Sequence, residues 1–545
     1  MEEPLPSSVD VVVLGTGLGE AMLAAACARS GLSVLHLDDA SYYGAEWASF
    51  NLRSLDEWIQ QQNEQQKEGG GDDPPNPDHV KEGEIFRPLK RKATVSVTKD
   101  EWSAGSEERI TEDKTYKEQV NEQWRRFSID ITPKVLLSRG DLVSTLCDSQ
   151  VSAYAEFKVV DRLLGVTPPS TLYRIPCSRG EIFDSDLLMI EKRRLMKFLQ
   201  LCLLWHKSDG QGDQLRTHAN RPFLEFLAEN GVQGSLANLI ARSLSFLSPP
   251  TSSPTVEEAL SSLCRFLDSV GTFAPSPFLV PLYGSGELPQ CFARLAAVFG
   301  GLYCLGRKIQ GVVEKEGKVV AVIAAGQRVE CQHLISSTAF IPNEWLEKKD
   351  EEEKGILRSI LISRGSLLPD SQKEHISMVN LSGLEPSSGA RLQEAGWEAC
   401  LAERAYFVGQ LTAVASPESR QLAEDVVDKW TTARNGNDKE VHGIDLSAQT
   451  RNSLKESSSL TPDAPTNVAV VRLPDGTADY ATVVTEAKFL FGKFWSDRDF
   501  LPRALQKSEE DEERKEEYGD EKEEEEEKEV ETKEEETENE KEQKD

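Results

Sequence analysis

Residues 9–38, VDVVVLGTGLGEAMLAAACARSGLSVLHLD, decide the fold. The apolar run 9–14 predicts a buried strand, the small residues of 21–28 predict a helix, and 33–38 predict a second strand. A glycine-rich turn joins the first strand to the helix. This order indicates a Rossmann-type β-α-β unit, and Asp38 ends the second strand at about the distance of a ribose-binding carboxylate.

The turn departs from the G-x-G-x-x-G pattern at its last glycine. Gly15 and Gly17 are present, but Glu20 stands where the third glycine is expected. That glycine normally lets helix and strand pack closely beside a pyrophosphate bound at the helix N-terminus. A glutamate adds bulk, and its carboxylate already occupies the field of the helix dipole. We therefore predict a scaffold turn without a cofactor, in which these residues and Asp38 are the remains of a dinucleotide site.

Charge excludes one class of partner. The 545 residues carry a formal net charge of -31, which disfavours nucleic acid because phosphate binding needs a basic surface. Residues 507–545 alone hold 23 acidic and 8 basic residues. Like charges repel and this segment lacks core residues, so 506–545 is predicted to be a disordered acidic tail.

Targeting and metal-binding signals are absent from the sequence. No signal peptide precedes the first strand, and no apolar run approaches the length of a membrane span. The nine cysteines show no C-x-x-C spacing, and the seven histidines do not cluster with cysteines or carboxylates at metal-ligand spacing. We expect a cytosolic protein with reduced cysteines and without a metal site.

Composition divides the chain into a discontinuous sheet domain, a helical domain and two polar segments. Residues 61–120 are polar and without period, so they are predicted to be a largely disordered insertion. Helical patterns predict an inserted all-helical domain over 139–269, and the sheet domain then comprises 1–60, 121–138 and 270–505. Within 270–505, residues 385–465 are weakly patterned, and their strands are not all identified.

One predicted helix, 191–202, carries the basic cluster Lys192-Arg193-Arg194. A solvated helix face is the simpler interpretation of this cluster, and binding of an acidic partner is the alternative.

The sequence contains no recognisable catalytic constellation. It lacks a G-x-S-x-G elbow and a Walker loop, and its histidines are scattered. An altered cofactor turn without catalytic partners indicates a binding protein on an enzyme-like scaffold, while a flavin-dependent oxidoreductase remains the alternative from another class.

Several blocks resemble the superfamily of Rab GDP-dissociation inhibitors and Rab escort proteins. The most specific is Pro281-Leu282-Tyr283-Gly284-Ser285-Gly286-Glu287-Leu288-Pro289-Gln290, and the turn with Glu20 and the following Tyr42-Tyr43-Gly44 also match. Five blocks resemble the escort proteins in particular: Trp47-Ala48-Ser49-Phe50, Arg126-Phe127-Ser128-Ile129-Asp130, Ser152-Ala153-Tyr154-Ala155-Glu156-Phe157, Ile175-Pro176-Cys177-Ser178-Arg179 and Leu288-Pro289-Gln290-Cys291-Phe292. The polar insertion is a further escort-type feature.

The resemblance implies a fold and a function. The fold would be α/β and FAD-oxidase-like, with the inserted helical domain of the inhibitors. Escort proteins bind newly made, GDP-bound Rab GTPases, present them to Rab geranylgeranyltransferase, hold the geranylgeranylated product and deliver it to membranes. They are accessory subunits and not enzymes. An inhibitor that only recycles lipidated Rab is the nearest alternative.

The resemblance also implies site residues. Tyr43, Glu287 and Arg294 would contact the Rab, with Leu302 and Cys304 at neighbouring positions where this chain departs from the inhibitors. The helical block would cover the geranylgeranyl chains and meet the transferase, into which Phe266 would insert. Without the resemblance, Glu287 and Arg294 would be interpreted as internal supports, and Tyr43 and Phe266 as packing residues.

Overall fold

The computed structural model describes fifteen ranges of the chain: 4–67, 79–92, 95–102, 114–167, 171–206, 210–234, 236–237, 240, 254–346, 355–368, 375–381, 390–422, 424–426, 441–448 and 460–503. The predicted tail, 506–545, lies outside the described residues, as does much of the predicted insertion.

The first sheet contains the β-α-β unit predicted from the N-terminus. Strand β1 pairs in parallel with β2 on one side and with β15 on the other. The order is β12-β2-β1-β15-β14-β13-β4, and β21 also pairs with β15. The strands span Ser8–Leu14 (β1), Val34–Leu37 (β2), Ile85–Pro88 (β4), Leu302–Cys304 (β12), Ile309–Lys315 (β13), Lys318–Ala324 (β14), Gln327–Ser337 (β15) and Val468–Val471 (β21).

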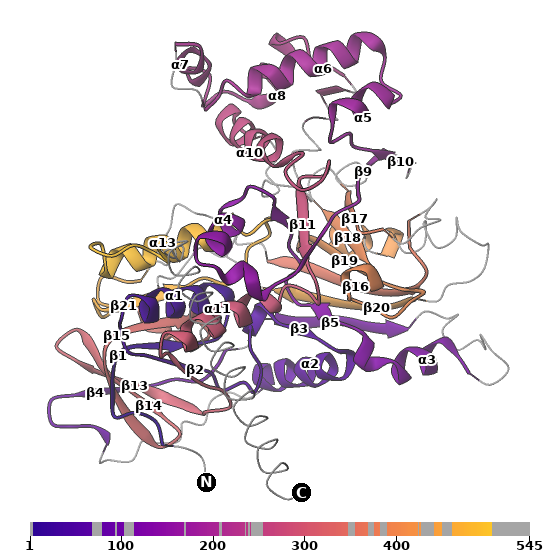
Figure 1. The fold of residues 1–545 in the computed structure, drawn as a ribbon. Coiled ribbons are helices and arrows are strands. Elements are labelled where there is room, and N and C mark those ends of the chain that lie inside the picture. Colours follow the sequence, from indigo (N-terminus) through magenta and orange to yellow (C-terminus); the bar gives the residue numbers. More distant parts are fainter. Residues whose placement is uncertain are drawn as a thin grey trace, which may run out of the picture.

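Three helices pack against one face of this sheet (Figure 1). They are α1 (Leu18–Arg29), α11 (Glu287–Val298) and α13 (Ala481–Phe494). Every residue of α1 except its last is buried, because the helix contacts both α11 and α13 as well as the sheet. Its small side chains permit this close approach.

A second eight-stranded sheet, which the sequence analysis did not recognise, lies beside the first (Figure 1). Its order is β10-β9-β17-β18-β19-β16-β20-β5. The strands span Val95–Trp102 (β5), Arg162–Thr167 (β9), Thr171–Arg174 (β10), Ile356–Arg364 (β16), Ser377–Asn380 (β17), Arg391–Ala395 (β18), Tyr406–Val414 (β19) and Val441–Ala448 (β20).

This sheet corrects two predictions. Strand β5 comes from the segment 61–120 that was expected to be largely disordered, and β4 of the first sheet comes from it too. Strands β9 and β10 lie in the segment 139–269 that was expected to be helical. Several strands of this sheet, β16 and β17 among them, are buried on both faces, so their sequences lack the alternation that distinguishes a strand from a helix.

Short elements connect the two sheets. The pair β3 (Ser49–Phe50) and β6 (Ile129–Asp130) and the triplet β7 (Leu136–Leu137), β11 (Phe278–Pro281) and β8 (Phe157–Val159) lie between them. Helices α2 (Leu52–Lys67), α3 (Tyr116–Glu122) and α4 (Asp141–Asp148) flank these strands. One hydrophobic core includes residues from α2, β6, β11 and the second sheet, which joins these parts into one body.

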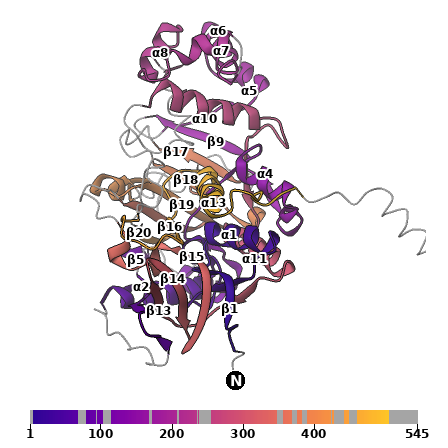
Figure 2. The same ribbon diagram turned by 90° about the vertical axis from the view of Figure 1, so that its left-hand side faces the viewer.

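The helical unit stands apart at one end of the molecule (Figures 1 and 2). It comprises α5 (Arg179–Asp184), α6 (Met189–Cys202), α7 (Gly210–Arg216), α8 (Phe223–Glu229) and α10 (Val256–Ser269), and it has a hydrophobic core of its own. Helix α10 begins with a capping box between Thr255 and Glu258. Among the described residues, no helix is long and apolar enough to cross a membrane.

Candidate functional site

The glycine-rich turn is filled by the protein itself. Gly15 has a φ of 93°, which a glycine adopts without strain. Glu20 is 4% exposed and folds back over Gly17: a Cβ added at Gly17 would lie 2.5 Å from its Oε2. Burial raises the pKa of Glu20 well above its usual value. Burial therefore favours the protonated, neutral form of this carboxyl group, whereas the sequence predicted a carboxylate in the field of the helix dipole.

The carboxylate that would bind ribose is also occupied. Asp38 is fully buried, accepts a hydrogen bond from Thr16 Oγ1 at 2.8 Å and pairs with Arg91 Nη1 at 2.8 Å. Arg91 belongs to the predicted insertion, and sequence reasoning did not find it. With Glu20 over the turn and Arg91 on Asp38, the residues present do not fit a dinucleotide.

The altered turn instead holds the Tyr43 loop. The N–H of Gly44 donates to the carbonyl oxygen of Thr16 at 3.0 Å and to its Oγ1 at 3.2 Å. The half-buried ring of Tyr43 lies 5.9 Å from that of Tyr303, measured between centroids. The loop is thus fixed from both sides, and Tyr43 is a rigid amphipathic side chain at the end of the sheet.

Helix α11 carries Glu287 and Arg294. Glu287 lies in its first turn and is half-buried, and burial raises the pKa of its carboxyl group. Arg294 is exposed two turns later, and its guanidinium lies 4.2 Å from the ring centroid of Tyr154. A guanidinium supported by an aromatic ring keeps its donors free for a carboxylate on another protein.

Leu302 and Cys304 lie on the edge strand β12. Tyr303 between them faces His36 and Tyr43, so strand alternation directs Leu302 and Cys304 to the other side. Leu302 is 50% exposed, and Cys304 is half-buried. Leu302 and Cys304 therefore lie on the strand whose Tyr303 contacts Tyr43, but their side chains point to the opposite face of that strand.

A buried hydrogen-bond network holds the loop before α11. Asp130 accepts bonds from Ser49 Oγ at 2.5 Å, from the N–H of Ser285 at 2.8 Å and from Ser285 Oγ at 3.0 Å. Tyr480 donates to Ser285 Oγ at 2.9 Å. Desolvation raises the pKa of Asp130 to about 6. These residues fix the backbone that leads into Glu287.

The sequence did not predict this hydrogen-bond network, although its residues lie in the blocks that resemble the family. Ser49, Asp130 and Ser285 belong to three separate blocks of the resemblance, and the fold brings those blocks together around one carboxyl group. A serine or aspartate whose partners are far away in the sequence gives no local signal.

Phe266 does not project toward solvent. It is 9% exposed, packs edge to face on Phe278 at 5.8 Å between centroids, and belongs to the core between the sheets. In this conformation its ring is not available for insertion into another protein. Phe266 points inward because it belongs to the buried apolar stripe of α10.

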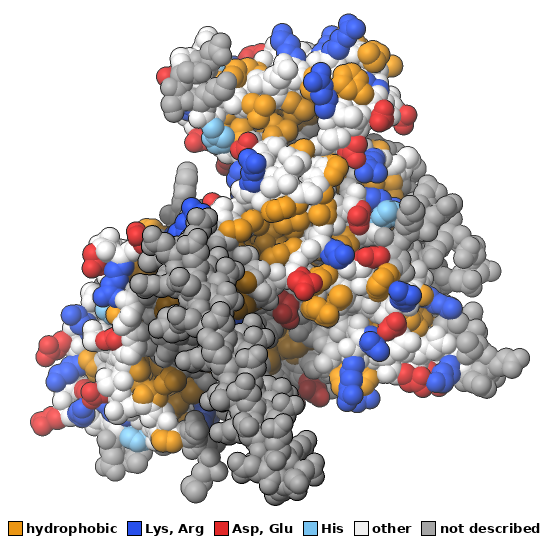
Figure 3. Space-filling view, viewed as in Figure 1, with side chains coloured by type: hydrophobic (Ala, Val, Ile, Leu, Met, Phe, Trp, Pro, Cys, Tyr) orange, Lys and Arg blue, Asp and Glu red, His pale blue; other side chains and the backbone are white. Residues whose placement is uncertain are grey.

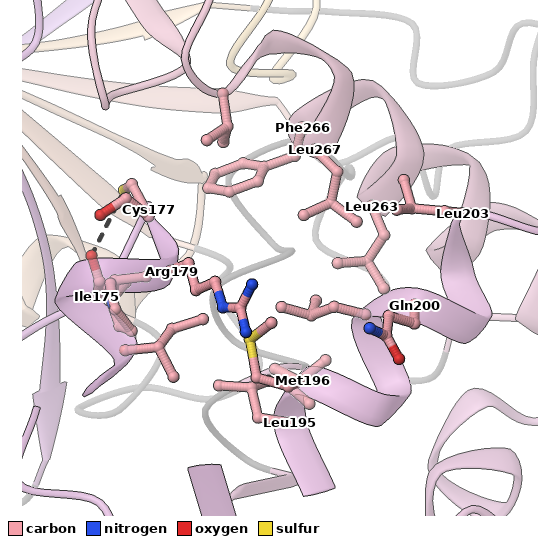
Figure 4. A pocket seen from close by; sticks show the side chains of 16 residues that line it. Ile175, Cys177, Arg179, Leu195, Met196, Gln200, Leu203, Leu263, Phe266 and Leu267 are labelled. Carbon is pink, nitrogen blue, oxygen red and sulfur yellow. Dashed lines mark hydrogen bonds between the residues drawn. The ribbon is translucent and has the colours of Figure 1, made fainter. Parts of the chain in front are cut away.

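Phe266 instead lines an apolar pocket between α5, α6 and α10 (Figure 4). The cavity has a volume of about 250 Å³. Most of its lining is aliphatic or aromatic: Ile175, Pro176, Cys177, Ser178, Arg179, Ile182, Leu195, Met196, Leu199, Gln200, Leu203, Ile240, Leu263, Phe266, Leu267 and Val270. The amphipathic faces of the two helices were predictable from the sequence, but a space between them was not.

Comparison with known proteins identifies the class. The family model described as "GDP dissociation inhibitor" matches residues 2–80 and 105–377. A relative from Caenorhabditis elegans, "Rab proteins geranylgeranyltransferase component A 1", is 42% identical over 93% of this chain and 97% of its own. The human protein with this description is 29% identical over 92% and 93% of the two chains. The chain belongs to the GDP dissociation inhibitor family, and the predicted resemblance is confirmed.

Solved structures agree on the fold. A Rab GDI from Plasmodium falciparum superimposes with a TM-score of 0.64 at 18% identity, covering 90% of this chain and 99% of its own. An oxidoreductase from Methanosarcina mazei has a TM-score of 0.50 at 13% identity, covering 90% and 100%. The predicted FAD-oxidase-like fold of the inhibitors is confirmed.

Proposed function

We propose that this chain is a Rab escort protein, the accessory component A of Rab geranylgeranyltransferase. It binds newly made Rab GTPases in their GDP form, presents them to the transferase heterodimer and keeps the lipidated product in the cytosol until membrane delivery. The relatives that carry the component A description align over nearly their whole length, which favours this function over that of a recycling inhibitor.

The observation that carries the proposal is the apolar pocket in the helical unit. Its lining is mostly apolar, with Ser178, Arg179 and Gln200 as its polar members, which suits a hydrocarbon chain better than a polar metabolite. An apolar cavity of about 150 Å³ holds a benzene-sized ligand, so about 250 Å³ takes roughly ten carbon atoms, about half of a geranylgeranyl group. The rest of the chain would lie across the half-exposed Leu203 at the rim or require the helices to separate.

The Rab-binding surface would be formed by Tyr43, Glu287 and Arg294. Tyr43 offers a rigid aromatic contact, and the two charged groups offer charge-assisted hydrogen bonds. Leu302 and Cys304 point to the opposite face of the edge strand from Tyr43, so they would contact the Rab only where it wraps around that edge. The network around Asp130 and the Thr16–Asp38–Arg91 cluster support this surface by fixing the two loops that form it.

The chain would supply binding and not bond making. The altered turn does not fit a dinucleotide, and among the described residues no group of three or more His, Cys, Asp or Glu side chains could hold a metal ion. Isoprenyl transfer would belong to the transferase, of which the relatives are described as component A. Phe266 would serve the lipid pocket, and contact with the transferase through its ring would require the pocket to open.

A reconstituted prenylation assay tests the proposal. Purified transferase heterodimer, geranylgeranyl pyrophosphate and a GDP-loaded Rab should give lipidated product only when this chain is added. Arg294→Ala should weaken Rab binding by roughly tenfold, since a hydrogen bond to a charged group is lost. Arg420→Ala, an exposed arginine beside the second sheet, is the matched control and should have no effect.

Two outcomes would contradict the proposal. Absence of any stimulation would exclude an escort function. Binding of lipidated Rab without stimulation of the transferase would identify a recycling inhibitor instead.

A further inference from the structure

The helical unit exposes an apolar tip where α5 is joined to α6. Leu188, Met189 and Ile190 are consecutive and are 67%, 58% and 56% exposed, and Phe183 is 48% exposed. Phe183 lies at the end of α5, Leu188 precedes α6, and Met189 and Ile190 begin α6; we call these four residues the α5–α6 tip. None of them lines the lipid pocket. Adjacent large apolar side chains at this exposure are unusual on a soluble surface and indicate an interaction site.

The chain order and capping explain why the tip projects. Leu188 precedes the first turn of α6, and its backbone N–H donates to Glu191 Oε2 at 3.0 Å. Lys192 reaches back and donates to the carbonyl oxygen of Phe183 at 2.7 Å. These bonds hold the turn, so the apolar side chains are displayed by a fixed backbone and not by a loose loop.

Basic side chains adjoin the tip on the α6 side. Arg193, Arg194 and Lys197 are exposed, and Glu191, the one acidic residue of α6, is engaged in the cap. Two exposed acids, Asp184 and Asp186, lie on the α5 side. Figure 3 shows hydrophobic and basic side chains together at the outer end of this unit. Such a basic face is notable in a chain whose formal net charge is -31.

The tip also adjoins the pocket. Helix α6 carries the exposed residues at its start and the pocket-lining residues Leu195, Met196 and Leu199 in its next turns. The same helix therefore connects an exposed apolar surface with the cavity proposed to hold the lipid. An exposed apolar surface flanked by cations suits a bilayer interface, where apolar side chains enter the acyl boundary and basic ones meet anionic headgroups.

We propose that the α5–α6 tip docks the protein on anionic membranes and brings the lipid pocket to the bilayer surface. This inference rests on the proposed escort function for its purpose, but the contact itself is a property of the chain alone. The occupant is a membrane containing acidic phospholipids, and a protein partner at this surface is an outcome that the experiment distinguishes.

Vesicle co-sedimentation of the full-length chain tests the proposal. Vesicles of phosphatidylcholine with phosphatidylserine should bind the wild-type protein more strongly than vesicles of phosphatidylcholine alone. The variant with Leu188→Ser, Met189→Ser and Ile190→Ser should bind roughly tenfold or more weakly, because three apolar side chains no longer enter the interface. Serine at position 188 favours the helix start, so α6 should remain folded.

Two further variants sharpen the test. Arg193→Glu with Arg194→Glu should weaken binding roughly tenfold or more on the anionic vesicles, with a much smaller effect on phosphatidylcholine alone. Leu224→Ser, on α8 in the same unit and 50% exposed, is the matched control and should bind as the wild type does.

Prenylation measured without vesicles separates this inference from the proposed function. The triple variant should still support prenylation in solution. If wild-type protein fails to bind vesicles, or if the triple variant binds them as well as wild type, the membrane contact is wrong. If the triple variant loses prenylation but keeps vesicle binding, the tip is a protein interface. If wild-type protein does not support prenylation, the escort function fails while the vesicle result stands on its own.

Discussion

The glycine-rich turn and the pocket of the helical unit contrast in one respect: the turn has a binding motif without space for a ligand, and the pocket has space for a ligand without a binding motif. The turn has a well-known binding pattern but no room for a ligand, since Glu20 lies over Gly17 and Arg91 pairs with Asp38. The pocket has no sequence pattern of its own but offers about 250 Å³ lined by apolar side chains.

The difference teaches that a binding motif and a binding site are separate properties. In the turn, Glu20 and Arg91 of the protein have taken the positions of ligand groups, and the turn now orders the Tyr43 loop through Thr16. In the helical unit, two amphipathic helices leave a gap that neither sequence shows. The first region is therefore expected to respond to mutation in its stability, and the second in its affinity for lipid.

Removal of Arg91 should have the largest effect. Arg91→Ala would leave the fully buried Asp38 without its cationic partner. Breaking a buried ion pair by removing one partner costs about 3–5 kcal/mol, so the free energy of unfolding should fall by that amount. Chemical denaturation would measure the loss.

The control for this variant also removes the negative charge of Asp38. Arg91→Ala combined with Asp38→Asn should recover a large part of the lost stability, because the fully buried charge is then gone and Asp39, the second carboxylate that Arg91 contacts at 2.8 Å, is 28% exposed. Equal losses in the single and double variants would mean that Arg91 acts by packing against Phe340, over whose ring it lies at 5.6 Å, and not as the partner of Asp38.

A charge at the rim of the pocket should have an intermediate effect, on affinity. Leu203→Glu places a carboxylate beside the proposed path of the lipid. The affinity for a geranylgeranylated Rab should fall by roughly tenfold to a hundredfold, the value of burying one leucine side chain. Affinity for the unlipidated Rab should not change. Titration with fluorescently labelled Rab in both forms would measure this.

The chain offers a closely matched control. Leu224 lies in the same unit, is 50% exposed where Leu203 is 49% exposed, and does not line the pocket. Leu224→Glu should bind both forms of Rab as wild type does. If the two variants behave alike, the loss comes from added negative charge and the pocket does not hold the lipid.

These tests concern regions that the sequence predicted unequally. The β-α-β unit was predictable because its pattern is local: an apolar strand, a glycine turn and a small-residue helix follow one another in 9–38. The second sheet was not, because its strands come from segments as far apart as Val95–Trp102 and Val441–Ala448. Strand pairing over such separations leaves no mark that one sequence can show.

The candidate site divides in the same way. Tyr43, Glu287 and Arg294 were found through blocks that resemble a family, and their roles remain predictions. Arg91 and the network around Asp130 were missed, since each acquires its meaning from a partner elsewhere in the fold. Phe266 was assigned to a transferase contact by the resemblance, whereas its apolar helical stripe indicated a packing residue, and in the structure it is 9% exposed.

The smallest expected effect is on the pH dependence of stability, and it comes from the protonation of Glu20. It tests directly whether the glycine-rich turn is closed to a ligand by the protein's own side chain. Burial raises the pKa of Glu20 well above 4.5, so the folded protein keeps a proton that the unfolded chain releases above that pH. By linkage, this group contributes least to stability at high pH: its contribution falls as the pH rises from 4.5 through the raised pKa. Glu20→Gln is nearly isosteric, cannot ionise and should lack this dependence.

The melting temperature of Glu20→Gln minus that of wild type should therefore increase as the pH is raised, while other buried groups titrate alike in both proteins and cancel. Thermal unfolding across a pH series would measure the difference. If the turn instead favoured a carboxylate at the helix N-terminus, as the sequence alone suggested, glutamine would be the less stable residue and the difference would become more negative with pH. The sign of the change in this difference with pH thus decides between two states of Glu20 in the turn. Glu20 is either a neutral, buried carboxylic acid or an ionised carboxylate that takes the place of the pyrophosphate.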